Sequence, residues 1–344
     1  MFTVNQHKKR IVLLFLGVLL FFLLNISLGS VIIPIQEIVK GILGITMEKD
    51  TWEIILFNFR LPKAITAILV GIGLAVSGLL MQTLFRNPLA GPYVLGLSSG
   101  ASLGVAFVIL GASILPVSIS SIFTSAYGIT FAAALGSFLV LLAVVLVATK
   151  LKNTMAILIV GLMFSSFSSA VVGVFTYFST AEQLQKYTFW SLGSIANLSW
   201  NQVGILSIFV SIGTIGSLWI IKPLNALLLG ENYAKSIGLN FTKTRFIIIA
   251  ITSILAGSIT AFVGPIAFIG LAVPHIAKLL FKTSNHFVLF LATLLLGACI
   301  MLVCDSIAQL PGSDLTLPIN AITSLFGAPI VIWLLVRKRN HQIL

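Results

Sequence analysis

The sequence predicts an all-α, polytopic membrane protein with about ten transmembrane helices, and its composition and hydrophobic pattern lead to this class. Of the 344 residues, 58% are hydrophobic and only 8% are charged. Charged residues make up about a quarter of an ordinary soluble domain. A transmembrane helix needs roughly 20 apolar residues, so the chain has room for about ten helices and short loops. Residues 1–344 are therefore predicted to form a single transmembrane domain.

Ten apolar runs are predicted as the membrane spans. They cover residues 11–30, 62–82, 93–112, 126–148, 154–178, 202–221, 244–263, 266–281, 286–304 and 317–336. The first run follows the basic cluster His7-Lys8-Lys9-Arg10, but no small-residue cleavage site of a signal peptide comes after it. We therefore expect the first run to be a transmembrane helix.

The charged residues orient these spans. With ten spans, both termini lie on one side, and fifteen of the 20 lysines and arginines fall on that side. An excess of Lys and Arg marks the cytoplasmic side of a membrane protein. Both termini are therefore predicted to be cytoplasmic, with outer loops at 31–61, 179–201 and 305–316. This bias also accounts for the net charge of +12, so we predict no nucleic-acid partner.

The cytoplasmic stretch 222–240 is too polar to cross a bilayer. Its pattern predicts two short helices separated at Gly230, with Pro223 in the first turn of the first helix. Glu231 and Lys235 are four residues apart, in the favourable order for an ion pair on a helix surface. Glu231 is the only acid on this basic side.

The outer loop 31–61 ends in Arg60-Leu61-Pro62-Lys63, directly before the second span. Two cations at this place can anchor the end of the helix, or they can bind an acidic partner. From these four residues alone, anchoring is the favoured interpretation.

The fifth span carries a row of small and hydroxyl residues: Gly161, Ser165, Ser169 and Gly173. Such a face either packs closely against another helix or lines a path for a polar solute. The residues alone slightly favour packing, and they do so more clearly for Gly96, Gly100 and Gly104 in the third span. After the fifth span, the outer segment 179–201 is predicted to contain a short surface helix with an interfacial tryptophan, Trp190.

Two similar stretches lie about half the chain apart. Gly91-Pro92 is followed by Gly96-Leu97, and Gly264-Pro265 is followed by Gly270-Leu271. The first span heads outward and the second inward in the predicted topology. This is the trace that an inverted repeat leaves in transporters. Before the first of them, Pro88, Gly91 and Pro92 require a sharp turn within residues 82–92.

No catalytic or metal-binding constellation is found in the sequence. There is no phosphate-binding loop, no pair of carboxylates and no activated nucleophile, so we expect no enzymatic activity and no cofactor. His275 has no second ligand at metal spacing, and a hydrogen-bonded packing role is favoured for it. Cys299 and Cys304 match no zinc site and are expected to pack in the apolar interior.

Asp305 is the only acid that the predicted spans bring to the membrane, at its outer edge. Ion-driven carriers usually place acids deeper, along the ion path. A secondary carrier therefore stays the main alternative among transporters, and an intramembrane enzyme is less favoured because it would need metal-ligand or nucleophile spacing.

Four stretches together resemble the permease subunit of bacterial ATP-binding-cassette (ABC) importers for iron–siderophore complexes, haem and cobalamin. They are Arg60-Leu61-Pro62, Arg86-Asn87-Pro88-Leu89-Ala90, Leu228-Leu229-Gly230-Glu231 with Ala234 and Gly238, and Gly270-Leu271 through Pro274-His275. The resemblance covers nearly the whole chain. It implies a fold of ten spans in the inner membrane, working by ATP-driven alternating access.

The resemblance also implies partners and residue roles. Two permease copies would work with two cytoplasmic ATPase subunits, and a periplasmic or lipid-anchored binding protein would deliver the substrate. Coupling to the ATPase carries over to Leu228, Leu229, Gly230, Glu231, Ala234, Lys235 and Gly238. Arg60 and Lys63 become docking residues for the binding protein, which replaces the anchoring interpretation. Ser165, Ser169 and Thr176 become candidate pathway residues, and the shared structural motifs contribute Arg86, Asn87, Pro88, Gly264, Pro265, Pro274 and His275.

Several positions depart from the family pattern. Lys63 and Lys278 stand where arginine is usual, which keeps the charge but loses the planar fork. Gln309 stands where an outer basic residue is common, and Thr316 and Asn320 replace a glutamate and a glycine, so no role is transferred to them. An iron–siderophore complex is the favoured substrate, with haem and cobalamin as alternatives for the same machine.

Overall fold

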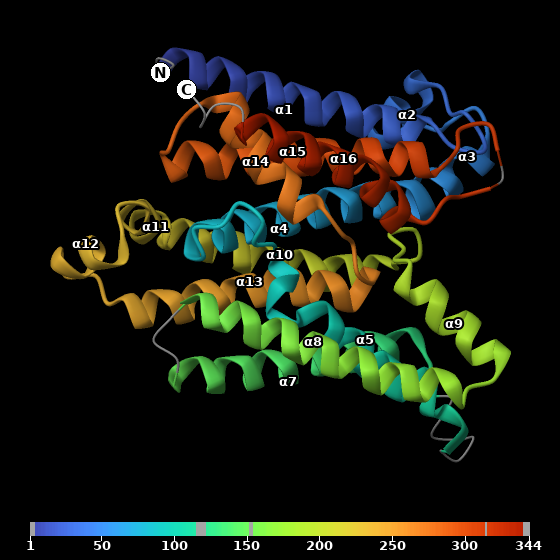
Figure 1. Ribbon diagram of the computed structural model, residues 1–344. Helices are drawn as coiled ribbons and strands as arrows, with labels where there is room; N and C mark the ends of the chain where they lie inside the picture. Colours follow the sequence, from blue (N-terminus) through green and yellow to red (C-terminus); the bar gives the residue numbers. More distant parts are fainter. Residues whose placement is uncertain (1–3, 115–121, 151–153, 314, 340–344) are drawn as a thin grey trace. The chain divides into compact units, whose positions relative to one another are not determined.

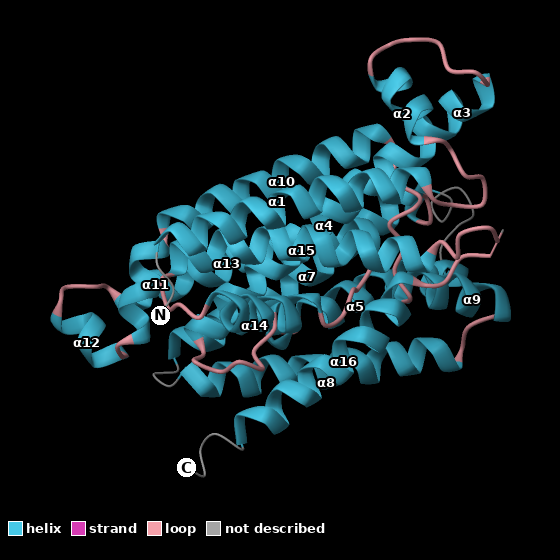
Figure 2. Ribbon diagram, turned by 90° about the horizontal axis from the view of Figure 1, so that it is seen from above, coloured by secondary structure: helices cyan, strands magenta, loops and turns pink. Residues whose placement is uncertain are grey.

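A computed structural model describes residues 4–114, 122–150, 154–313 and 315–339. Within these ranges all regular structure is helical (Figure 2). The chain forms two compact units rather than one: unit 1 comprises residues 1–79, 194–208 and 266–344, and unit 2 comprises residues 80–193 and 209–265. Two long helices, α4 (Leu61–Leu84) and α10 (Trp200–Trp219), contribute residues to both.

Unit 1 is built around α15 (His286–Ala308). The first helix, α1 (Val4–Ser27), packs along α15, and α14 (Ile269–Phe281) and α16 (Ile319–Arg339) also contact it (Figure 1). The outer segment holds α2 (Ile35–Ile42), α3 (Asp50–Ile55) and a π-helical turn, η1 (Leu56–Arg60). These short helices lie within residues 31–61, for which only an outer loop between two membrane spans was predicted. They are too short for a search for membrane spans to find them.

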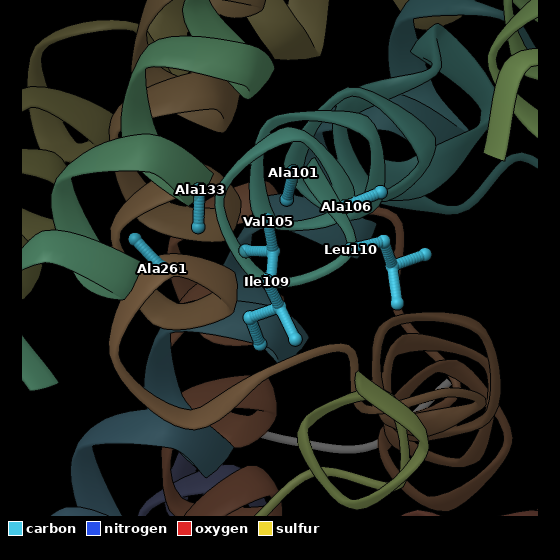
Figure 3. Close-up of a cluster of buried hydrophobic side chains, with 7 residues drawn as sticks. All are labelled: Ala101, Val105, Ala106, Ile109, Leu110, Ala133 and Ala261. Carbon is cyan, nitrogen blue, oxygen red and sulfur yellow. The ribbon is translucent and has the colours of Figure 1, made fainter. Parts of the chain in front are cut away.

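Unit 2 is built around α5 (Leu97–Ile109), which contacts α7 (Ala126–Lys150), α8 (Thr154–Tyr177), α9 (Ala181–Ser191) and α13 (Phe241–Val263). Its buried cluster joins α5 to α7 and α13 (Figure 3) and comprises Ala101, Val105, Ala106, Ile109, Leu110, Ala133 and Ala261. The small side chains allow the three helices to approach closely. The unit is completed by α11 (Ile221–Leu228) and α12 (Glu231–Ser236), at the opposite end from α9 (Figure 1).

All ten predicted spans coincide with helices, but the helices differ in length. In the described part of the chain, seven are long and apolar enough to cross a membrane, while the apolar helices Leu97–Ile109, Ile269–Phe281 and Ile319–Trp333 are shorter. The expected span 93–112 is wrong as a single helix. It is divided into η2 (Pro92–Leu95), α5 and η3 (Gly111–Ile114), because Gly96 takes a left-handed conformation with φ of 80°.

The expected span 266–281 begins only at Ile269. Gly264 has a φ of 77° and Phe268 a φ of 65°, and neither conformation continues a helix. The backbone between them has no regular structure, and the amide of Ala267 donates a hydrogen bond of 2.9 Å to Oδ1 of Asn320. Asn320, to which no role was transferred, therefore stabilises the backbone that leads into α14.

Several helices touch through backbone atoms at glycine. In unit 1, a Cβ added to Gly78 would lie 1.8 Å from the carbonyl oxygen of Gly270, and one on Gly71 would lie 2.2 Å from that of Gly297. In unit 2, a Cβ on Gly104 would lie 2.1 Å from the carbonyl oxygen of Ala132. Close helix packing was predicted for the glycine row of the third span, and the α5–α7 contact confirms it.

We predict that Gly78→Ala destabilises the protein. Its methyl group cannot be accommodated without separating the backbones of α4 and α14, so the free energy of unfolding should fall by at least about 1–3 kcal/mol. Thermal unfolding of the protein in detergent measures this. Gly204→Ala is the matched control, because an added Cβ there meets nothing within 4 Å. Equal melting temperatures for the two variants would contradict the prediction.

Candidate functional site

The segment 222–240 has the predicted form of two short helices. Gly230, with a φ of 119°, separates α11 from α12, and Gly238, with a φ of 85°, ends the turn after α12. Side chains rarely adopt such conformations, so both positions favour glycine. Asn240 then caps α13, its Oδ1 accepting a hydrogen bond of 3.0 Å from the amide of Lys243.

Four large apolar side chains of the segment 222–240 are exposed. Leu228, Leu229, Tyr233 and Ile237 are 45–65% exposed, whereas Ala234 is fully buried. An exposed apolar patch on a polar segment is typical of a protein–protein contact. The predicted ion pair between Glu231 and Lys235 stays a prediction, because it concerns side chains outside the described part of the structure.

Arg86 connects this segment to the end of α4. Its Nη2 donates a hydrogen bond of 2.9 Å to the carbonyl oxygen of Leu227, near the last turn of α11. The backbone of Arg86 is left-handed, with a φ of 48°, and the next residue closes a turn: Oδ1 of Asn87 accepts a hydrogen bond of 2.9 Å from the amide of Leu89. The Arg86-Asn87-Pro88 motif therefore supports α11, a contact between residues 141 positions apart that no local pattern could reveal.

Arg60, predicted to dock a binding protein, is 8% exposed and is used inside unit 1. Its Nη1 donates hydrogen bonds of 2.8 Å to the carbonyl oxygens of Ile26 and Ser27, and its Nη2 donates to that of Val31. The guanidinium group therefore fixes the chain as it leaves α1. No acidic side chain is among these partners.

Lys63, the second predicted docking residue, forms an ion pair with Asp305. Its Nζ lies 3.0 Å from Oδ1 of Asp305, and the two side chains are 15% and 1% exposed. The other carboxylate oxygen of Asp305 accepts hydrogen bonds of 2.9 Å from Asn25 and from Gln309. Gln309, which departs from the family pattern, thus completes a polar network that joins α1, α4 and α15.

Two of the three predicted pathway residues line a cavity in unit 2, which we call the hydroxyl chamber. Its volume is about 370 Å³, and its lining consists of Tyr93, Ser98, Ser99, Ser102, Ser165, Ser168, Ser169, Val172 and Tyr187. Thr176 does not line it. The serines of α8 at 165, 168 and 169 share one helix face, which the spacing of three and four residues explains.

Hydrogen bonds hold part of this lining in place. Oγ of Ser99 donates to the carbonyl oxygen of Gly96 at 2.9 Å and lies 3.1 Å from Oγ of Ser165, which in turn bonds the carbonyl oxygen of Gly161. Burial raises the pKa of Tyr187, and its hydrogen bond with Ser102 opposes that rise. The phenol is therefore neutral at physiological pH.

Four other positions singled out in the sequence are closely packed or buried. Gly264 has no room for a side chain, because an added Cβ would lie 2.6 Å from the carbonyl oxygen of Trp190. Pro274 is buried inside α14, and Cys299 and Cys304 are free and buried. Among the described residues, no group of three or more His, Cys, Asp or Glu side chains could hold a metal ion.

The long apolar helices, together with the shorter apolar helices α5, α14 and α16, are typical of a multi-pass membrane protein. The fold matches a solved metal-chelate type ABC transporter in an inward-facing conformation, with a TM-score of 0.84, 29% identity, and 96% of this chain and 99% of that chain covered. The model of the FecCD transport family matches residues 17–337, and the chain belongs to this family.

Two permeases of known transport systems are similar to this chain over most of its length. The chain is 33% identical over 334 residues to the hemin transport system permease protein HmuU of Yersinia pestis, covering 96% of this chain and 97% of HmuU. It is 35% identical over 292 residues to the vitamin B12 import system permease protein BtuC of Citrobacter koseri, covering 84% of each chain. The protein is thus a non-catalytic permease of an ABC importer, and a separate ATPase subunit hydrolyses ATP.

We predict that the pair Lys63–Asp305 is energetically coupled. Asp305→Asn leaves a buried ammonium group without its carboxylate, and breaking a buried pair in this way costs on the order of 3 kcal/mol. The double variant Lys63→Met/Asp305→Asn should recover part of this loss. Melting temperatures of the purified wild type, the two single variants and the double variant measure the coupling. If the single losses simply add, the pair is not coupled.

Proposed function

We propose that this permease imports a bulky metal chelate, with an iron–siderophore complex as the favoured substrate, across the bacterial inner membrane. Two copies of the chain would surround a shared path, with both termini in the cytoplasm and membrane lipid around the outer faces of the spans. The names of the relatives give hemin and vitamin B12, so haem and cobalamin are the alternative substrates of the same machine.

The observation that carries the mechanism is the attachment of the exposed α11–α12 segment to the membrane helices. Leu228, Leu229 and Tyr233 offer an apolar surface to the ATPase, while Arg86 ties α11 to the end of α4. The segment continues directly into α13 through the cap at Asn240. A displacement of α11 and α12 by the ATPase would therefore pull on α4 and α13 together, which supports alternating access driven by ATP.

Docking of the binding protein is proposed at the outer end of unit 1. Lys63 keeps 15% of its side chain exposed, and an acidic residue of the binding protein could replace Asp305 as its partner. Arg60 is held by three backbone carbonyls, which makes it the less available of the two. In this proposal the docking contact competes with the internal network of Lys63, Asp305, Asn25 and Gln309.

An ion-driven secondary carrier was the other class of transporter considered from the sequence, and membership of the FecCD transport family argues against it. Its proton- or ion-binding acid would have to be Asp305, but this carboxylate already has a cation and two amide donors as partners. Uptake that persists in liposomes with an ionophore, and that stops without ATP or without the ATPase subunit, would exclude this alternative.

We predict that Gly230→Ala uncouples ATP hydrolysis from transport. An alanine at φ of 119° is strained by on the order of 1–3 kcal/mol, so the connection between α11 and α12 should change shape. In proteoliposomes with the ATPase subunit and the binding protein, the amount of chelate imported per ATP hydrolysed should fall roughly tenfold, while ATPase activity remains.

Gly257→Ala is the control for this experiment, because an added Cβ there meets nothing within 4 Å and its helix backbone accepts alanine. It should keep the wild-type ratio of uptake to hydrolysis. If Gly230→Ala also keeps this ratio, the segment 222–240 is not the coupling element.

A further inference from the structure

The hydroxyl chamber contains groups that the packing of unit 2 does not use. Helix α5 contacts α7 through Gly100 and Gly104, where an added Cβ would lie 2.6 and 2.1 Å from backbone oxygens of α7. Its serines lie in the chamber instead, and α8 contributes the other serines. The glycines of α5 thus make the close contact with α7, and the serines of α5 line the chamber.

Ser168 is the most informative of these residues. It is 1% exposed, and its Oγ has no hydrogen-bond partner in the described structure. Leaving a buried hydroxyl unpaired is unfavourable, so the wild-type residue needs another benefit to offset it. Ser98 and Ser169 also line the chamber. The hydroxyl groups of these three serines are the candidates for hydrogen bonds to a ligand.

The chamber has no charge. Its nine lining residues are serine, tyrosine and valine, and the phenol of Tyr187 is neutral because burial raises its pKa. The charged pair on α9, Glu182 and Lys186, is 2.8 Å apart, largely exposed and self-neutralising. A multiply charged anion would lose hydration in the chamber without gaining a cation, which is costly. A bare metal ion would find no carboxylate, so a metal must arrive already chelated.

The size of the chamber limits how a ligand uses it. At about 370 Å³ it lies at the lower end of the range for ligand pockets, so it can take one face of a bulky chelate rather than all of it. That face must present hydrogen-bond acceptors or donors and carry little charge. Three hydroxamates neutralise Fe³⁺ and leave their oxygens on the surface of the complex, whereas three doubly deprotonated catecholates leave it strongly anionic.

We propose that the hydroxyl chamber recognises an uncharged, hydrogen-bonding face of the chelate, so that this permease favours ferric tris-hydroxamates over ferric tris-catecholates. The inference rests on the proposed function and adds the charge class of the substrate. Ser168, Ser169 and Ser98 are the specificity-determining residues, and Tyr187 supplies a neutral donor at the wall formed by α9.

Direct binding tests this selectivity. The permease–ATPase complex is purified without its binding protein, which would otherwise select the chelate by itself, and is dialysed against radioactive iron in a ferric tris-hydroxamate or a ferric tris-catecholate. The hydroxamate complex should bind at least tenfold more tightly. Equal binding of the two chelates, or tighter binding of the catecholate, would overturn the proposal.

The variants Ser168→Ala and Ser166→Ala make a matched pair. Ser168→Ala should weaken hydroxamate binding about fivefold, the size expected for one net hydrogen bond, without lowering the melting temperature of the ligand-free complex. Ser166 is exposed and donates to the carbonyl oxygen of Leu162, so Ser166→Ala should bind normally. Unchanged binding by Ser168→Ala would overturn the assignment, as would a loss shared by both variants.

Ser169→Lys provides the converse test, because it places a cation at the more exposed serine of the chamber. It should shift the preference toward the anionic catecholate chelate.

Failure of the chamber proposal and failure of the importer proposal give different results. ATP-driven uptake of haem or a catecholate chelate with no hydroxamate preference overturns only the former. An active ATPase with a binding protein but no uptake of any chelate overturns the latter.

Discussion

Backbone contact at glycine is the constraint on which both units depend. Within a bilayer the lipid chains are as apolar as the helix surfaces, so helices associate through close packing rather than through a hydrophobic driving force. Unit 1 meets this requirement where Gly71 and Gly78 on α4 receive the carbonyl groups of α15 and α14. Unit 2 meets it where Gly104 on α5 contacts α7. Glycine has only a hydrogen atom in place of a side chain at these contacts. The larger and the polar side chains of the same helices are therefore not needed for helix packing there.

The polar side chains of the spans fall into two groups with different consequences. Arg60 and Asp305 are buried and Lys63 is 15% exposed, and each has partners within unit 1 that hold the outer ends of the helices together. Ser168 is buried without a partner. Polar groups that all have hydrogen-bond partners are explained by their role in the structure. A buried hydroxyl without a partner beside a cavity calls for a different explanation, and a ligand that is bound only part of the time provides one.

Hydrophobic patterning and glycine placement predicted the membrane spans and the break at Gly230, because these depend on neighbours in the chain. The family was suggested separately, by the resemblance of four short motifs. The short helices α2 and α3 were missed, since eight and six residues carry too little pattern. Of the three serines of α8 that line the chamber, Ser165 and Ser169 were singled out as candidate pathway residues and Ser168 was not, although it lies three residues after Ser165 on the same face. The contacts of Arg86 with α11 and of Lys63 with Asp305 join distant positions, and no local pattern contains them.

The helices α5 and α14 are shorter than the thickness of the bilayer. Both α5 and α14 contain 13 residues and are therefore about 20 Å long, against a hydrocarbon thickness of roughly 30 Å. Before α14, the chain from Gly264 to Ala267 has no regular structure, whereas α5 is flanked by the short 3₁₀ helices η2 and η3. Such backbone persists at that depth only where protein covers it or water reaches it. Residues 264–267 must therefore be covered by protein or reached by water if they lie at membrane depth.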